Sequence, residues 1–92
     1  MPITRINRFE AKRGSTEKLQ GFLRSVLSTI EKYPGCRSVK LLQSTEDPGH
    51  LAIIEEWDSV ESHQEASKAI SPEQMKQAMV LFRRPPAGEY YQ

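Results

Sequence analysis

Apolar positions in the first third of the chain follow two different periods. Residues 3–10 alternate between two faces, as in a strand, and both faces mix apolar and polar side chains. Apolar residues then recur at steps of three and four, namely Leu19, Phe22, Leu23, Val26, Ile30 and Tyr33. This predicts a helix that begins at Ser15 or Thr16, as a side-chain cap, and ends at Pro34-Gly35. Gly21 lies inside this helix, and we expect its small size to allow close packing against the sheet.

Two short apolar runs in the middle of the chain predict a hairpin. Val39–Leu42 and Leu51–Ile54 flank a polar segment that contains Asp47-Pro48-Gly49. The proline fixes φ and the glycine permits a positive φ, so the chain can reverse there. The second run continues to Glu56-Trp57 and carries apolar residues on both faces. We therefore expect helices on one face of the sheet and a second cover, most simply another copy of the chain, on the other.

The last third of the chain contains two helix starts and a proline stop. Asp58-Ser59 predicts a cap for a helical region with apolar positions at Val60, His63, Ala66 and Ile70. Ser71, followed by Pro72 and Gln74, predicts a restart with a capping box. An apolar stripe follows at Met75, Ala78, Met79 and Phe82. We expect this helix to end at Arg83-Arg84, before Pro85-Pro86, and residues 89–92 to form a short last strand.

The predicted order is strand, helix, strand, strand, helix, strand. This is the order of an α+β, ferredoxin-like βαββαβ domain, with an antiparallel sheet and helices on one face. The 92 residues suffice for one core, so residues 1–92 are expected to form a single domain.

Composition excludes several classes of partner. The net charge is +1 and charges of both signs are interspersed, so neither nucleic acid nor a membrane surface is an expected partner. A single cysteine, Cys36, rules out an internal disulfide, and no apolar run approaches the roughly 18 residues of a membrane span. The first residues, Met1–Arg5, lack the pattern of a signal peptide. We expect a cytoplasmic protein.

Several sequence features together resemble the antibiotic biosynthesis monooxygenase (ABM) family of the dimeric α+β barrel superfamily. They are Asn7 in the first strand, Tyr33-Pro34-Gly35-Cys36 before the second, Glu55–Ser59 after the third, and Pro85-Pro86 before the last. The resemblance covers nearly the whole chain. It implies a homodimer in which two sheets face each other as a barrel, with a pocket between sheet and helices in each subunit. This dimer would cover the second face of the sheet.

The resemblance also implies a chemistry. Family members that oxidise aromatic polyketides use neither metal nor flavin, and bind a phenol or hydroquinone whose anion passes an electron to O2. By this resemblance the protein is a cofactor-independent monooxygenase or related oxidoreductase, with no cofactor, acting on a small aromatic or quinol-like substrate. The alternative on the same scaffold is a non-catalytic small-molecule-binding or stress-response protein.

Two departures limit which branch of the family the chain resembles. The polyketide oxygenases carry an Asn on the first strand, and a second Asn four residues before a Trp on the third. Asn7 and Trp57 match, but Ile53 replaces the second Asn. Haem-degrading members place an iron-ligating His on the second helical region. Here the corresponding positions are Ala66 and, near Lys76-Gln77, no histidine, which argues against haem degradation.

Three residues are candidates for catalysis. Asn7 is an amide among apolar neighbours, and it either contacts a ligand or makes a structural hydrogen bond. Trp57 either stacks on an aromatic substrate or anchors a helix to the sheet. His63 lies on the apolar side of its helix, as a base for a phenol or as a core histidine.

Five residues are candidates for binding the substrate: Arg5, Phe22, Ile53, Met79 and Phe82. Arg5 would neutralise a phenolate, or instead form an ion pair with Glu55 across the sheet. Phe22, Phe82 and Met79, like Met75, line a pocket or simply belong to the core. His50 and His63 lack the spacing of metal ligands, so no metal site is expected, and His50 is expected to be exposed beside the turn.

Overall fold

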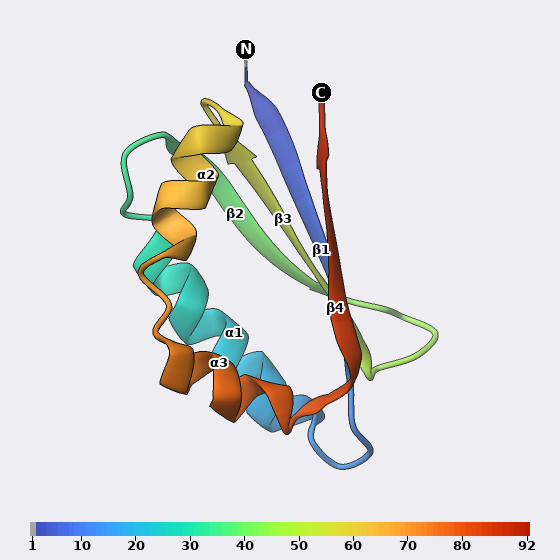
Figure 1. Cartoon of the computed structure of the whole chain (residues 1–92). Helices are drawn as coiled ribbons and strands as arrows, with labels where there is room; N and C mark the ends of the chain where they lie inside the picture. The colour runs from blue at the N-terminus through green and yellow to red at the C-terminus, as the bar shows by residue number, and fades with distance from the viewer. Residues whose placement is uncertain (1) are drawn as a thin grey trace.

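The computed structural model describes residues 2–92 and has the element order βαββααβ (Figure 1). The strands are β1 (Ile3–Ala11), β2 (Cys36–Gln43), β3 (His50–Trp57) and β4 (Phe82–Tyr91). The helices are α1 (Thr16–Ile30), α2 (Val60–Ser67) and α3 (Pro72–Met79). The predicted order is confirmed, and the second helical region consists of two short helices because the chain leaves α2 before Ser71 starts α3.

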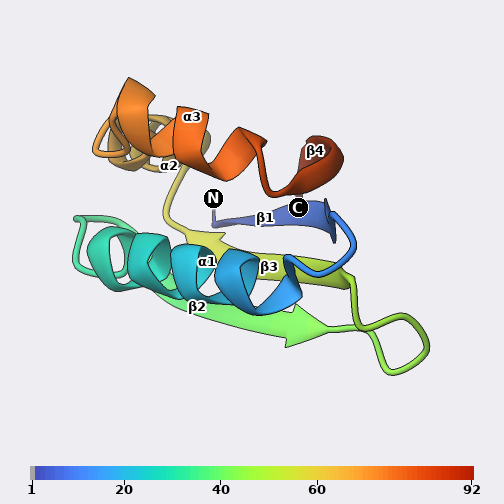
Figure 2. The same cartoon turned by 90° about the horizontal axis from the view of Figure 1, so that it is seen from below.

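The four strands form one antiparallel sheet in the order β2-β3-β1-β4. Figure 1 shows the three helices on one side of this sheet. In Figure 2, α1 lies beside β2 and β3, and α3 lies beside β4. The α+β, ferredoxin-like fold expected from the sequence is therefore confirmed.

The core lies between the sheet and the helices. The apolar positions of α1 that recur every three or four residues are buried, and so are the inward positions of β1 and β3. These side chains include Leu19, Leu23, Leu27, Ile30, Ile3, Phe9, Leu51, Ile53 and Trp57. Each such burial contributes about 1.5–3 kcal/mol, so this shared layer fixes the position of α1 on the sheet.

The helix starts agree with the sequence at two places and disagree at one. Ser71 Oγ accepts from the Gln74 N–H, and Gln74 Oε1 accepts from the Ser71 N–H, which confirms the capping box. Ser59 Oγ accepts from the Ser62 N–H and caps α2. Ser15 precedes α1 but makes no side-chain cap bond, so that prediction was wrong. Its backbone N–H instead donates to the Lys12 carbonyl in the preceding turn.

Gly21 also differs from its expected role. It lies on the exposed side of α1, and an added Cβ would meet no atom within 4 Å. The buried stripe of α1 that starts at Leu19 packs against the sheet, and Gly21 lies outside this stripe. Close packing at this glycine was therefore a wrong prediction.

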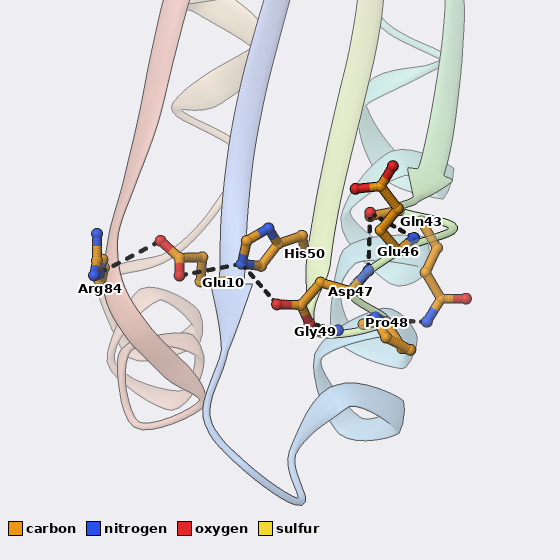
Figure 3. Close-up of polar contacts among 9 residues, drawn as sticks. Glu10, Gln43, Glu46, Asp47, Pro48, Gly49, His50 and Arg84 are labelled. Atoms are coloured by element: carbon orange, nitrogen blue, oxygen red, sulfur yellow. Dashed lines mark hydrogen bonds and ion pairs between the residues drawn. The ribbon is translucent and has the colours of Figure 1, made fainter.

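Side-chain hydrogen bonds hold the turn of the β2-β3 hairpin (Figure 3). Ser44 Oγ accepts from the backbone N–H groups of Glu46 and Asp47, at 3.2 and 3.1 Å. Asp47 Oδ1 accepts from the Gly49 N–H at 3.0 Å. Gly49 does not use a positive φ, which the structure shows at Gly14 and Gly35 instead. The carboxylate two residues earlier shapes this turn without it.

A histidine and three ionic side chains tie the hairpin end to the neighbouring strands (Figure 3). His50 Nε2 lies 3.3 Å from Glu10 Oε1 and 3.2 Å from Asp47 Oδ2. Glu10 Oε2 in turn lies 3.5 Å from Arg84 Nε on β4. The His50 side chain is half exposed, so its predicted position at the surface is confirmed.

The end of the chain differs from the sequence prediction. The last helix, α3, ends at Met79, and Phe82 begins β4 instead of completing the helical stripe. Pro85 and Pro86 lie within this strand and do not merely precede it. A proline is tolerated there because β4 is an edge strand. In addition, the pairing of β4 with β1 shifts register on both sides of the Glu10–Arg84 pair, so the regular ladder is interrupted there.

Candidate functional site

A cavity of about 220 Å³ lies between the sheet and the helices. Its size is below the roughly 300 Å³ at which drug-sized sites begin, so it suits a small ligand. The apolar side chains that line it come from all parts of the fold: Phe9, Phe22, Leu23, Val26, Ile30, Ile53, Ala66, Ile70, Met75, Ala78, Phe82 and Pro86. A ligand that fills this space must be mostly apolar.

Polar lining residues are few. Asn7 from β1, Glu55 from β3 and His63 from α2 line the cavity, together with Ser67. Asn7 pairs with Ile53 in the sheet, and Glu55 is the next inward position along β3, so their side chains are diagonal neighbours. His63 Nε2 lies 3.7 Å from Glu55 Oε1. Two strands and a helix thus bring three functional groups to one part of the cavity wall.

His63 is held by aromatic and polar neighbours. Its Nδ1 lies 2.7 Å from the Tyr90 hydroxyl on β4, and its ring meets Trp57 and Tyr90 edge-on. Burial, and then the positive charge of Arg5, lower the pKa of His63 to about 4. The imidazole is therefore neutral at neutral pH, with one donor and one acceptor nitrogen.

Glu55 is the buried carboxyl group of the site. Only 3% of the residue is exposed, and its Oε1 accepts a hydrogen bond of 2.8 Å from Trp57 Nε1. Burial raises the pKa of the Glu55 carboxyl, against the opposing effects of the Trp57 bond and the Arg5 charge. A buried carboxyl with a perturbed pKa in a cavity is typical of functional sites. From the sequence, Glu55 was expected as a partner of Arg5 and as part of the Glu55–Ser59 segment, and its inward position between Ile53 and Trp57 was a usable signal for the site.

Most of the chain matches one known protein family. Residues 2–80 match the family described as Antibiotic biosynthesis monooxygenase. The chain belongs to this family. None of the curated protein sequences matches the chain. The family expected from Asn7, Tyr33-Pro34-Gly35-Cys36, the Glu55–Ser59 segment and Pro85-Pro86 is thereby confirmed.

Solved structures similar to this ABM chain have the same fold. Rv0793 from Mycobacterium tuberculosis is 25% identical, with a TM-score of 0.87 over 100% of this chain and 94% of that one. A conserved protein from Methanosarcina mazei is 18% identical, with a TM-score of 0.88 over 100% and 92%. SnoaB from Streptomyces nogalater, described as a cofactor-independent oxygenase, is 15% identical, with a TM-score of 0.83 over 99% and 91%. At identities below 25%, the likeness shows the fold alone.

Arg5 of this ABM chain differs from the expected ion pair. Arg5 and Glu55 are paired residues of β1 and β3, but the group beside Glu55 Oε1 is His63 and not the guanidinium. Arg5 Cζ instead lies 4.5 Å from the centre of the Tyr90 ring, a cation-π contact. Its Nε is buried without a hydrogen-bond partner among residues 2–92. The predicted direct ion pair was therefore wrong, because the arginine turns toward β4.

Asn7 lies opposite a glycine that the sequence analysis did not consider. Asn7 pairs with Gly88 of β4, and a Cβ at Gly88 would collide with Asn7 Oδ1 and Arg5 Nη2. The missing side chain leaves room for both polar groups above β4. Such a role depends on strand pairing, which no local pattern in the sequence reveals.

The structure places most of the predicted site residues at the cavity and three elsewhere. Asn7, His63, Phe22, Ile53 and Phe82 line the cavity. Arg5, Trp57 and Met79 are absent from its described lining residues.

Trp57 and Met79 lie on opposite extremes of burial. Trp57 is fully buried and reaches the site through its bond to Glu55, which favours the anchoring interpretation. Met79 is 61% exposed because it is the last residue of α3, and Met75 lines the cavity in its place.

Other reactive groups were also located. Burial and the nearby charges of Glu55 and Glu31 raise the pKa of the Cys36 thiol, which disfavours a thiolate nucleophile. Within the described residues, no three His, Cys, Asp or Glu side chains are grouped to hold a metal ion. No helix formed by residues 2–92 is both long and apolar enough to cross a membrane.

Proposed function

We propose that the protein is a cofactor-independent oxygenase that acts on a small aromatic or quinol-like compound. The observation that carries this proposal is the small apolar cavity, with Asn7, Glu55 and His63 among its few polar groups. Membership of the ABM family and the fold shared with SnoaB support it. Neither a metal nor an organic cofactor is part of the proposal.

The proposed chemistry needs an electron-rich phenol and O2. The ring occupies the apolar cavity, the hydroxyl faces the polar groups, and loss of its proton gives an anion that reduces O2. In a quinone-forming reaction one oxygen atom enters the ring as a carbonyl, the other leaves as water, and the phenol supplies four electrons. The cavity contributes orientation and exclusion of water.

Each predicted catalytic residue has a distinct role in this proposal. Asn7 orients the substrate oxygen through its amide. His63 is neutral at neutral pH because its pKa is lowered to about 4, so it acts as a hydrogen-bonding group. Trp57 acts through Glu55, to which it donates a hydrogen bond. Arg5 stabilises anionic charge from beside Tyr90, outside direct contact.

Oxygen uptake tests the proposed function. With a series of hydroquinones and naphthols, the wild-type protein should consume O2, and Asn7→Ala should lower kcat/KM at least tenfold. Lys18→Ala is the control, because Lys18 is exposed on α1, does not line the cavity and is not part of the open sheet face, so this change should have little effect. Saturable binding without O2 uptake would reject the oxygenase and favour the alternative, a non-catalytic binding or stress-response protein.

We also propose a homodimer formed through the face of the sheet that the helices leave open. Ile6 and Ile54 are paired there, as are Leu42 and Ala52, and Leu42 is 42% exposed. A second sheet of the same kind would bury these apolar residues. The family resemblance favours this arrangement of two sheets. A cytoplasmic location of the protein also stays a prediction.

A further inference from the structure

The carboxylate of Glu55 has one oxygen occupied and one available. Trp57 Nε1–H donates to Oε1, and His63 Nε2 faces the same oxygen at 3.7 Å. Oε2 has no hydrogen-bond partner among residues 2–92, although the residue lines the cavity and is 3% exposed. Because Oε2 makes no hydrogen bond to the described protein residues and Glu55 lines the cavity, a donor on a ligand in the cavity is the simplest partner for it.

We infer that Glu55 accepts a hydrogen bond from the hydroxyl group of a small, uncharged aromatic ligand, and that it takes the hydroxyl proton when the ligand reacts. His63 and Tyr90 are positioning residues in this assignment. The proton-transfer step rests on the proposed oxygenase function, whereas the hydrogen bond can be tested by binding alone.

The contacts of His63 explain why it is not the acceptor. His63 Nε2 faces the Glu55 carboxylate, which favours the neutral tautomer with the proton on Nε2, and Nδ1 then accepts from the Tyr90 hydroxyl at 2.7 Å. That N–H points toward Glu55 Oε1, so no imidazole nitrogen is left to accept from the ligand. The Tyr90 contact therefore sets the His63 N–H beside Glu55 Oε1, at 3.7 Å, and leaves Glu55 to accept from the ligand.

Charge balance favours the same assignment. The O–H bond of the ligand breaks, its electron pair stays on the ligand oxygen, and the proton joins Glu55 Oε2. The negative charge is on the Glu55 carboxylate before this step and on the ligand oxygen after it, so the apolar cavity never holds an additional charge. Burial raises the pKa of Glu55, which makes this carboxylate a stronger base than an exposed one and reduces the difference from a phenol.

The test compares a phenol with its methyl ether, which lacks the O–H donor and carries one methyl group more, and the variant below separates these two differences. Binding of 2-naphthol and 2-methoxynaphthalene to the full chain is measured by calorimetry. The wild-type protein should prefer 2-naphthol about tenfold or more, because a charged acceptor gains a hydrogen bond. Glu55→Gln, which keeps the shape and an acceptor for Trp57, should bind the ether as before and lose most of the preference.

A second variant tests the positioning residues. Tyr90→Phe removes the hydroxyl that holds His63 and should lower the preference for 2-naphthol roughly two- to tenfold, with ether binding unchanged. If Glu55→Gln does not fold, the preference of the wild type for 2-naphthol, measured as a function of pH, tests the assignment of Glu55 in its place. An unchanged preference in folded Tyr90→Phe would overturn the role of Tyr90.

The dependence of ligand binding on pH distinguishes a hydrogen-bond acceptor at Glu55 from a merely structural role of this residue. The preference of the wild type for 2-naphthol should decline on acidification as Glu55 is protonated, and Glu55→Gln should show no such decline. The titratable or charged groups near Glu55 are Arg5 on β1, Cys36 on β2 and His63 on α2, and Tyr90 on β4 contacts His63 and Arg5.

The outcomes separate the two proposals. A folded Glu55→Gln that keeps the wild-type preference, or a wild type that binds neither probe, would overturn the assignment of Glu55. A wild type that prefers 2-naphthol but consumes no O2 with any phenol would reject the oxygenase and leave the Glu55 hydrogen bond intact.

Discussion

At the scale of single residues, the absence of a side chain at Gly88 shapes the site as much as the polar groups do. Asn7 Oδ1 and Arg5 Nη2 both occupy the space where a Cβ at Gly88 would lie. The orientation of two candidate functional groups thus depends on a residue of a different strand.

Gly88→Ala should therefore displace Asn7 and Arg5. We expect binding of 2-naphthol to weaken several-fold and the free energy of unfolding to fall by about 1–3 kcal/mol, since the added methyl group overpacks the site. Calorimetry and urea unfolding measure the two effects. Gly21→Ala is the matched control, because its Cβ meets nothing and should raise stability by roughly 0.5–1 kcal/mol. Wild-type binding by folded Gly88→Ala would contradict this account.

His63 predicts a dependence of stability on pH. Its pKa falls from 6.5 to about 4 on folding, so between these values the unfolded chain binds a proton that the folded chain does not. Stability contributed by neutral His63 is present above pH 6.5 and is lost as the pH falls toward 4. After allowance for partial solvent contact, we expect a loss of about 2 kcal/mol.

Urea unfolding of wild type and His63→Gln at several pH values measures this loss. The variant should lose less stability than the wild type between pH 6.5 and 4. Glu55 acts in the opposite direction, because its raised pKa stabilises the fold below that pKa. Glu55→Gln should therefore make the acid loss steeper. Equal slopes for wild type and His63→Gln would contradict the lowered pKa.

At the scale of elements, the helix caps differ in what they contribute. Ser71 makes both bonds of a capping box at the start of α3, whereas Ser15 makes no side-chain bond at the start of α1. The two serines occupy the same formal position, so they form a matched pair.

Ser71→Ala should lower the free energy of unfolding by about 1 kcal/mol, and Ser15→Ala by distinctly less. Thermal or urea unfolding of the two variants measures the difference. Because α3 supplies Met75 and Ala78 to the cavity, Ser71→Ala should also loosen that wall and weaken binding of 2-naphthol. Equal destabilisation by both substitutions would show that the capping box contributes little.

The last strand shows why an element can be misplaced by sequence pattern alone. Met75, Ala78, Met79 and Phe82 have helical spacing, and Pro85-Pro86 normally ends a helix. The chain nevertheless enters β4 at Phe82, whose ring stacks on Phe9 of β1 at 5.8 Å. Pairing with β1 along a free edge favours the strand over one more helical turn, and the edge position tolerates the prolines.

At the scale of the whole molecule, one side of the sheet is covered by helices and the other is open. Ile54→Glu would place a charge in the middle of that open face, beside Ile6. If two copies join there, this variant should be monomeric while the wild type is dimeric, as measured by analytical ultracentrifugation.

Val80→Glu is the control for this prediction. Val80 is 64% exposed and follows the last residue of α3, on the helical side of the sheet and not on its open face. It should leave the dimer intact. A wild type that sediments as a monomer, or an Ile54→Glu variant that stays dimeric, would contradict assembly through the open face.

Local patterns in the sequence determined the order of elements and part of the site. Strand alternation and helical spacing depend only on neighbours along the chain, and so do the Ser71 cap and the Asp47 turn. The same alternation correctly turned Asn7 and Ile53 inward, and helical spacing placed His63 on the cavity side of α2.

Only the tertiary structure decided what those inward groups meet. His63 and Tyr90 are 27 residues apart in sequence, and strand pairing and the packing of α2 bring them together. Glu55 becomes a buried acid with a raised pKa because helices cover it, and Gly88 matters because β4 pairs with β1. Burial and contacts between distant segments set these properties, and no periodicity along the chain records either one.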